Sequence, residues 1–384
     1  MSLLINYLSK ENYFKQYLIN DVGKLDDIKY EYALPNTTKR IILSREKVTL
    51  FDVLESEKID ILIYNLMNKS EIEKLNKLKN IRIIYYIHSS FLASIYMHIN
   101  NFKNTVYYSY KKCKYILSLI PLENDYLFKL WGINSIQIQN LVTFEYNLIV
   151  PSNLLSKNII MLGRAYASIK RYNLGIKAMK FIIKEIPDCK MTIISTPYYE
   201  LNDLIRNLNL EKNIIFSGYQ KNPEQFLKNA SLHILCSLCE SYPLALAETK
   251  IFGIPSILCG LDYLVLAKGG TVIIYDDTPE TIAVEAIKIM NNYTYRKNLG
   301  TEARISMKKY TNDLIIKKWI QILLTVYKND EKKYKNLFSD DKNNETLKAY
   351  EADKILNNQL YLLKKRINYY KDISIENLKH YSFK

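Results

Sequence analysis

Glycine is scarce in this chain of 384 residues, which contains only ten glycines. Only Gly23 and Gly132 precede residue 163, so the first part of the sequence has no glycine-rich loop that would let the backbone approach a bound group closely. The motif Gly-x-Gly-x-x-Gly does not occur anywhere in the chain. Its absence argues against an enzyme that uses a dinucleotide.

Cysteine is also rare, and its spacing excludes a disulfide framework. Cys236 and Cys239 form a single C-x-x-C pair with no second pair beside it, so we expect neither a zinc site nor a redox site there. An odd number of cysteines without regular spacing is typical of a reducing compartment, and we therefore expect the cytoplasm. The five cysteines are Cys113, Cys189, Cys236, Cys239 and Cys259.

The sequence has no segment that suits a membrane span or a secretion signal. The longest apolar candidate, residues 81–99, contains Arg82, His88 and His98 and is better explained as strand, loop and helix. The first residues lack a basic region followed by an apolar one. A weak attraction to the cytosolic face of an anionic membrane stays open, because the net charge is +15.

The basic excess is spread over the whole chain and does not form one stripe, so we expect no nucleic-acid partner. The 33 tyrosines are equally scattered, and no RNA-binding motif accompanies them. A basic module for nucleic acid or membrane surfaces is the weakest functional hypothesis, since it rests on charge alone.

Short apolar segments alternate with helical stretches, which predicts an α/β protein with two parallel sheets covered by helices. Residues 1–142 and 158–311 are the expected Rossmann-like domains, and residues 143–157, with Pro151, are the expected linker. The expected strands are 59–64, 81–86, 115–120, 135–139, 159–162, 191–195, 214–217, 232–236, 256–259 and 272–275, and the expected helices include 172–184, 279–291 and 312–327.

The last segment, residues 329–384, differs in character from the rest. Residues 329–344 are highly charged, and residues 347–378 carry apolar side chains at helical spacing. This helical tail is either packed on the protein or a partner helix for self-association, and both alternatives stay open.

Two glutamates eight positions apart, Glu240 and Glu248, mark the most informative stretch of the sequence. An apolar strand precedes them, Ser241 is a candidate N-cap, and a helix is expected to begin at about Tyr242. The free N–H groups of such a helix suit a diphosphate, Glu248 could accept hydrogen bonds from a ribose diol, and Glu240 could meet a sugar. The alternative is two solvated glutamates on an ordinary amphipathic helix.

A second element, Gly163-Arg164 followed by Lys170, comes directly after a buried strand. Arginine presents a fixed fork of donors that suits a diphosphate, and lysine adds a mobile positive charge. Together with the two glutamates, this element indicates a nucleotide-sugar site.

The combination resembles the retaining glycosyltransferases of family 4, which have the two-domain GT-B fold. The resemblance rests on Glu240-x7-Glu248, on Gly163-Arg164 with Lys170, and on Gly253-Ile-Pro255. It also includes residues 130–140, which look like the strand that ends the first domain of that family. It covers about residues 80–325, and the ordered set is far more specific than any one motif.

The resemblance implies roles for individual residues. Arg164 and Lys170 would hold the donor diphosphate, Glu248 the ribose, and Glu240 the donor sugar as a catalytic residue. His88, the second catalytic residue, would reach that sugar from the other domain. Residues 312–328 would form a helix that crosses back onto the first domain. The remaining donor-binding residues would be Gly163 and the loop of Ser241, Tyr242, Pro243 and Leu244.

The sequence also departs from that family. The missing glycine-rich loop leaves the acceptor side undefined, and Ser241-Tyr242-Pro243 stands where glycines are common. Since no Asp-x-Asp occurs, we expect a metal-independent reaction. The resemblance implies a retaining enzyme without a cofactor. Its substrates would be a nucleotide-diphosphate sugar, a UDP-sugar by preference, and a glycan, lipid or protein acceptor. The main alternative is a non-catalytic binding protein on a degenerate GT-B scaffold.

Overall fold

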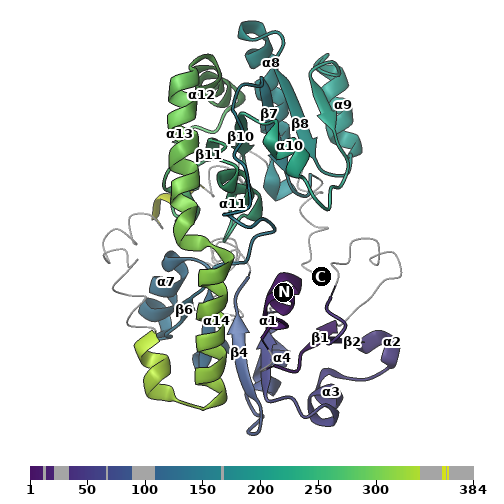
Figure 1. The fold of residues 1–384 in the computed structure, drawn as a ribbon, viewed down its shortest axis with the longest axis vertical. Helices are drawn as coiled ribbons and strands as arrows, with labels where there is room; N and C mark the ends of the chain where they lie inside the picture. Colours follow the sequence, from purple (N-terminus) through teal and green to yellow (C-terminus); the bar gives the residue numbers. More distant parts are fainter. Residues whose placement is uncertain are drawn as a thin grey trace.

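Two parallel sheets, each in a domain of its own, lie one above the other along the long axis of the molecule (Figure 1). The computed structural model describes residues 1–11, 14–20, 34–65, 68–88, 109–165, 168–337, 357–359 and 361–362.

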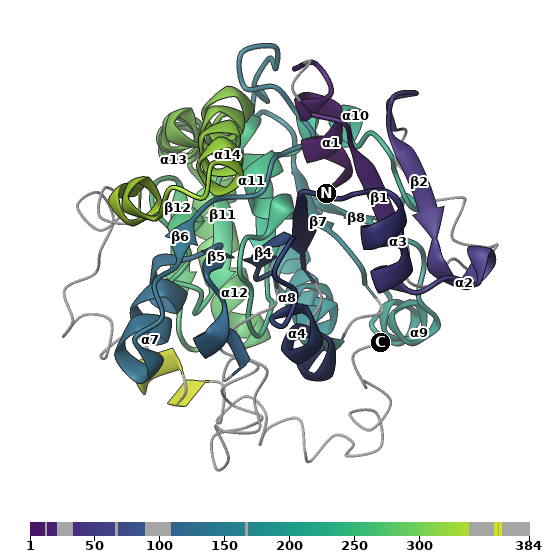
Figure 2. The same ribbon diagram turned by 90° about the horizontal axis from the view of Figure 1, so that it is seen from below.

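The first domain is built on a four-stranded parallel sheet in the order β3-β4-β5-β6. A separate parallel pair, β1 with β2, lies at one side of this domain (Figures 1 and 2). The strands are β1 (Tyr17–Asn20), β2 (Lys39–Ile42), β3 (Ile61–Tyr64), β4 (Arg82–Tyr86), β5 (Tyr115–Ser118) and β6 (Ile136–Gln137). The helices are α1 (Ser2–Leu8), α2 (Leu43–Glu46), α3 (Leu50–Ser56), α4 (Lys69–Leu75) and α7 (Pro121–Trp131), with the short 3₁₀ turn η3 (Tyr110–Lys112).

The second domain has a six-stranded parallel sheet in the order β12-β11-β10-β7-β8-β9. Helices α8, α9 and α12 contribute to the core on one face, and α11 packs into the core on the other. The strands are β7 (Asn158–Leu162), β8 (Lys190–Ile194), β9 (Ile214–Phe216), β10 (Leu232–Leu235), β11 (Ser256–Cys259) and β12 (Thr271–Ile274). The helices are α8 (Tyr172–Glu185), α9 (Tyr199–Asn207), α10 (Glu224–Lys228), α11 (Leu244–Ile251), α12 (Pro279–Asn291) and α13 (Tyr293–Ser306), with the 3₁₀ turns η4 (Ser168–Lys170), η5 (Val265–Ala267) and η6 (Met307–Tyr310).

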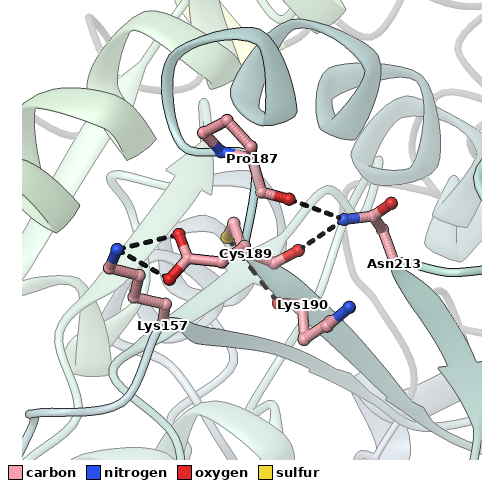
Figure 3. Close-up of polar contacts among 6 residues, drawn as sticks. Lys157, Pro187, Cys189, Lys190 and Asn213 are labelled. Carbon is pink, nitrogen blue, oxygen red and sulfur yellow. Dashed lines mark hydrogen bonds and ion pairs between the residues drawn. The ribbon is translucent and has the colours of Figure 1, made fainter.

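The central strands of both sheets are mainly apolar because helices cover both of their faces. All side chains of β5, β10 and β11 are buried. Polar contacts hold the amino-terminal edge of the second sheet, where Asn213 Nδ2 donates to the carbonyls of Pro187 and Cys189 at 3.3 and 2.9 Å (Figure 3). This edge is opposite the one that carries the candidate site.

Helix α14 (Asn312–Tyr327) follows the second domain in sequence but packs against β3 and α1 of the first (Figure 1). Its first residue, Asn312, is buried and holds the backbone of Val142, the residue before the expected linker. The Asn312 amide accepts from the N–H of Val142 and donates to the Val142 carbonyl, both at 3.0 Å. It also donates to the Tyr7 hydroxyl at 2.9 Å. One side chain therefore connects the linker, α14 and α1.

The described parts of the tail pack on the protein itself. The hydroxyl of Tyr334 accepts from the N–H of Ile116 in β5 at 3.0 Å and donates to the carbonyl of the same residue at 3.1 Å. Gln359 is buried against the second domain, where its amide donates to the Gly260 carbonyl at 2.7 Å and to Asp262 Oδ1 at 2.5 Å. Most of the helical pattern predicted over residues 347–378 lies outside the described residues.

The predicted fold class is confirmed. Every strand expected from the sequence is present, with ends within two residues of the expected ones. The pattern missed β1, β2 and α13, and the domain boundaries stay predictions. Among the described residues, no helix combines the length and apolar character needed to cross a bilayer. All five cysteines are free, as expected without a disulfide framework.

Replacing Asn312 by Ala should destabilise the protein by about 3 kcal/mol, because the buried N–H and C=O of Val142 would lose their partner. Asn292, the N-cap of α13, is a matched control, since its side chain accepts a single hydrogen bond from Tyr295 N–H near the surface. Asn292→Ala should cost about 1 kcal/mol. Urea denaturation measures both losses, and equal losses would contradict a central role for Asn312.

Candidate functional site

The candidate site lies at the carboxyl-terminal edge of the second sheet, where β7, β10 and β11 end. These three strands are neighbours and run parallel, with β10 in the middle. Their carboxyl ends therefore share one edge, the usual place for ligands in open α/β sheets. Residues far apart in the sequence meet there.

Gly163 and Arg164 follow β7. Gly163 has φ +132°, a conformation that favours glycine, and a side chain there would also meet the Tyr172 hydroxyl at 3.3 Å. The next turn is fixed by the N–H of Ala165, which donates to Ser195 Oγ at 3.0 Å. Arg164 is exposed, so its guanidinium is accessible to a ligand.

Lys170 and Glu240, seventy residues apart, form an ion pair with 2.5 Å between Nζ and Oε1. Ser237 Oγ donates to the same carboxylate oxygen at 2.6 Å. The lysine side chain is 23% exposed and the glutamate side chain 11%. The structure thus brings together two residues that the sequence assigned to one site, and the pair is partly shielded from water.

The backbone of Glu240 is held by Tyr263, which follows β11. The Tyr263 hydroxyl accepts from the N–H of Glu240 and donates to its carbonyl oxygen, both at 2.8 Å. No sequence pattern predicts this contact. The segment after β11 comes next to Glu240 only because β10 pairs with β11.

Helix α11 begins later than predicted. Pro243, not Ser241, is the N-cap, and the first helical residue is Leu244 instead of about Tyr242. The reason is local: a residue before proline is driven away from helical dihedrals, and Pro243 itself is extended with ψ 107°. Ser241, Tyr242 and Pro243 are buried in the preceding loop, and Leu244 is exposed.

Glu248 lies in the second turn of α11 and is only 9% exposed. Burial raises the pKa of its carboxyl to about 7, and a hydrogen bond with Thr143 opposes this shift. Thr143 belongs to the expected linker, so Glu248 lies where the linker meets the second domain. A carboxyl group in this setting can bind ligand hydroxyls, and its charge changes near neutral pH.

His88 comes from the first domain, just after β4. Its ring stacks edge-on against Tyr86 with 4.0 Å between ring centres, and its Nε2 is buried without a hydrogen-bond partner among the described residues. Burial lowers the pKa of His88 to about 4, so the imidazole is neutral at pH 7. Tyr242 of the second domain is close enough to Tyr86 to help raise the pKa of its phenol. The end of β4 thus lies near the loop after β10.

Metal ligands do not gather at this edge. Within the part of the chain that the structure describes, no group of three or more His, Cys, Asp or Glu side chains could hold a metal ion.

Residues 150–306 match the family model described as glycosyl transferases group 1. The chain is 25% identical over 182 residues to N-acetyl-alpha-D-glucosaminyl L-malate synthase of Bacillus anthracis, covering 46% of this chain and 48% of that protein. It is also 25% identical over 159 residues to poly(glycerol-phosphate) alpha-glucosyltransferase of Bacillus subtilis, covering 40% and 24%. The chain therefore spans less than half the length of these relatives.

Solved structures show the same fold. Sucrose-phosphate synthase from Thermosynechococcus elongatus superposes with a TM-score of 0.66 at 14% identity, over 85% of this chain and 92% of that one. The Anabaena protein HepE in complex with UDP and glucose gives a TM-score of 0.63 at 13% identity, over 82% and 100%. The protein therefore has the GT-B fold.

The predicted site residues occupy one region, but their roles stay predictions. Lys170 and Glu240 meet directly, Gly163 and Arg164 lie at the end of the neighbouring strand, and Glu248 lies on the helix that follows. The contributions of Ser237, Tyr263 and Thr143 were not expected. All three act on the glutamates through hydrogen bonds.

Replacing Glu248 by Gln should remove a pH dependence of stability. The raised pKa means that the folded protein binds this proton more tightly than the unfolded chain, whose carboxyl has the ordinary pKa of 4.5. The free energy of unfolding should therefore fall as the pH rises from about 4.5 to about 7, by up to about 3 kcal/mol. Urea denaturation at about pH 5 and about pH 7.5 measures this fall in the free energy of unfolding.

The exposed Glu280 on α12 supplies the matched control for this titration. Glu280→Gln should keep the pH dependence of the parent, whereas Glu248→Gln should lose most of it. A parent-like slope in Glu248→Gln would show that this carboxyl does not titrate near neutral pH.

Proposed function

We propose that the protein is a retaining glycosyltransferase that moves a sugar from a nucleotide-diphosphate donor, a UDP-sugar, to an acceptor of unknown chemistry. The observation that carries the proposal is the Lys170–Glu240 ion pair at the carboxyl edge of the second sheet, with Arg164 at the end of the next strand. This edge belongs to the segment that matches the glycosyl transferases group 1 family.

The residues suit the electrostatics of this reaction. The bond from the anomeric carbon to the diphosphate oxygen breaks, and the leaving group gains negative charge. Arg164, Lys170 and the free N–H groups at the start of α11 can stabilise that charge. A hydroxyl oxygen of the acceptor bonds to the same carbon, and its proton leaves with the diphosphate or to solvent.

The two glutamates and the histidine take different parts. Glu248 accepts hydrogen bonds from the ribose, and Glu240 faces the donor sugar, where positive charge develops. The neutral His88 offers its Nε2, which has no hydrogen-bond partner among the described residues, to a sugar hydroxyl from the other domain. The proposed reaction uses no metal and no cofactor, and it takes place in the cytoplasm. The acceptor, a glycan, lipid or protein, would bind on the side of the first domain.

The ligands found in solved structures of similar proteins support a UDP-sugar as the donor. TarM of S. aureus was solved in complex with UDP and alpha-GlcNAc-glycerol, and it resembles this chain with a TM-score of 0.57 at 20% identity over 70% of this chain and 55% of that one. HepE was solved with UDP-glucose, UDP and glucose, or UDP. A UDP-sugar is therefore the first donor to test, and NMR of the product anomer tests retention.

UDP should bind and stabilise the protein by about 2.7 kcal/mol when present at 100 times its Kd. Arg164→Ala and Lys170→Ala should each weaken binding by roughly 1.5 to 3 kcal/mol, because each removes charge-assisted hydrogen bonds to phosphate. Calorimetry measures the affinity. Arg206→Ala, which removes an exposed arginine paired with Asp203 on α9, is the control and should bind UDP like the parent.

No thermal shift with any nucleoside diphosphate at millimolar concentration would remove the donor site. Donor binding without transfer to any acceptor and without donor hydrolysis would instead favour the binding protein on a degenerate scaffold.

Glu240→Gln should lower turnover about a hundredfold while leaving UDP affinity unchanged or higher. The charge that this carboxylate faces develops only in the transition state, and the substitution also releases Lys170 from its ion pair. Glu248→Gln should chiefly weaken UDP binding. Calorimetry with UDP and a donor-consumption assay on both variants check this, and equal losses of UDP affinity would contradict the assignment of roles.

A further inference from the structure

The Tyr263 hydroxyl holds the backbone of Glu240 through both the N–H and the carbonyl group of that residue. The hydroxyl accepts from the Glu240 N–H and donates to the Glu240 carbonyl, each at 2.8 Å. The Tyr263 side chain is only 4% exposed, so these bonds are shielded from competing water. Residues 236–243, which carry Glu240, belong to no helix or strand. A regular hydrogen-bond ladder therefore does not set the position of this residue.

The carboxylate of Glu240 is held separately, by Lys170 and Ser237. In the proposed reaction Lys170 turns to the diphosphate, so the ion pair is weakened when the donor binds. The Tyr263 contacts do not involve the carboxylate and can persist in that state. They are thus suited to keep Glu240 in place when its own ion pair is lost.

The segment that carries Tyr263, residues 260–263, is itself fixed at several points. Gly260 N–H donates to the Ile274 carbonyl at 2.7 Å, and the Tyr275 hydroxyl donates to Asp262 Oδ2 at 2.8 Å. From the tail, the buried amide of Gln359 donates to the Gly260 carbonyl at 2.7 Å and to Asp262 Oδ1 at 2.5 Å. The hydrogen bonds from the tail to Gly260 and Asp262 and those from Tyr263 to Glu240 are therefore joined by the short backbone segment 260–263.

We propose that Tyr263 is a positioning residue for Glu240, and that Gln359 of the tail supports this positioning by fixing the segment that carries Tyr263. The inference rests on the proposed function, because it concerns the residue that faces the donor sugar. Neither side chain is assigned a contact with the substrate. Both act through the backbone geometry of the loop after β10.

Tyr263→Phe removes the hydroxyl and keeps the ring, so the fold should be retained. We expect kcat for donor consumption to fall about tenfold, since a small displacement of a catalytic group lowers the rate by up to about a hundredfold. UDP affinity should stay within about twofold of the parent, because the hydroxyl bonds to the backbone of Glu240, whose carboxylate is assigned to the donor sugar and not to the nucleotide. Tyr64→Phe is the matched control, since it removes a hydroxyl of a buried tyrosine that bonds to Glu71 in the first domain, outside residues 260–263, and it should keep the parent kcat.

The double variant Glu240→Gln with Tyr263→Phe separates positioning from a general structural effect. If Tyr263 acts through Glu240, the second substitution should change kcat by less than about twofold once the carboxylate is gone. An additional tenfold loss in the double variant would overturn the proposal, and so would a parent-like kcat in Tyr263→Phe.

Gln359→Leu tests the part played by the tail. We expect kcat to fall about threefold with UDP affinity unchanged, and we expect this loss to vanish in the Glu240→Gln background. A parent-like kcat in Gln359→Leu would overturn the role of the tail while leaving that of Tyr263. Failure of the proposed function is recognised separately: the parent itself would then neither bind UDP nor consume any nucleotide sugar.

Discussion

The parallel pairing of β7, β10 and β11 is the constraint on which the candidate site depends. Parallel strands end at the same edge of a sheet, so the residues that follow each of them are forced together whatever their distance in sequence. Lys170, Glu240 and Tyr263 come from the connections after three different strands, yet each contacts one of the others. The order of the strands in the sheet therefore assembles the site from three separate segments of the chain.

The ion pair between Lys170 and Glu240 has two consequences for ligand binding. Both side chains are largely shielded from water, so removing one partner without replacement would be costly. A bound diphosphate can supply negative charge in place of the carboxylate. Lys170 would therefore keep a negatively charged partner when its contact with Glu240 weakens on donor binding.

Sequence patterns predicted the two sheets well because the strands are buried, apolar and bounded by turns, as in β10 and β11. They missed α13, whose polar sequence buries only a narrow stripe that includes Leu299 and Ala303. The start of α11 was misplaced because Ser241 satisfies an N-cap preference that Pro243 overrides. Arg164, Lys170, Glu240 and Glu248 could be proposed from spacing. Tyr263 could not, since its contact depends on which strands are neighbours.

The contact of Tyr334 with β5 has a consequence for how this protein behaves in concentrated solution. Strand β6 contains only Ile136 and Gln137, so it does not extend far enough to pair with Ile116 on that side of β5. An unpaired stretch of apolar strand is a template on which a second molecule can add its own strand, which leads to aggregation. The Tyr334 hydroxyl occupies both hydrogen-bonding groups of Ile116. Tyr334 therefore leaves neither backbone group of Ile116 free to pair with a strand of a second molecule.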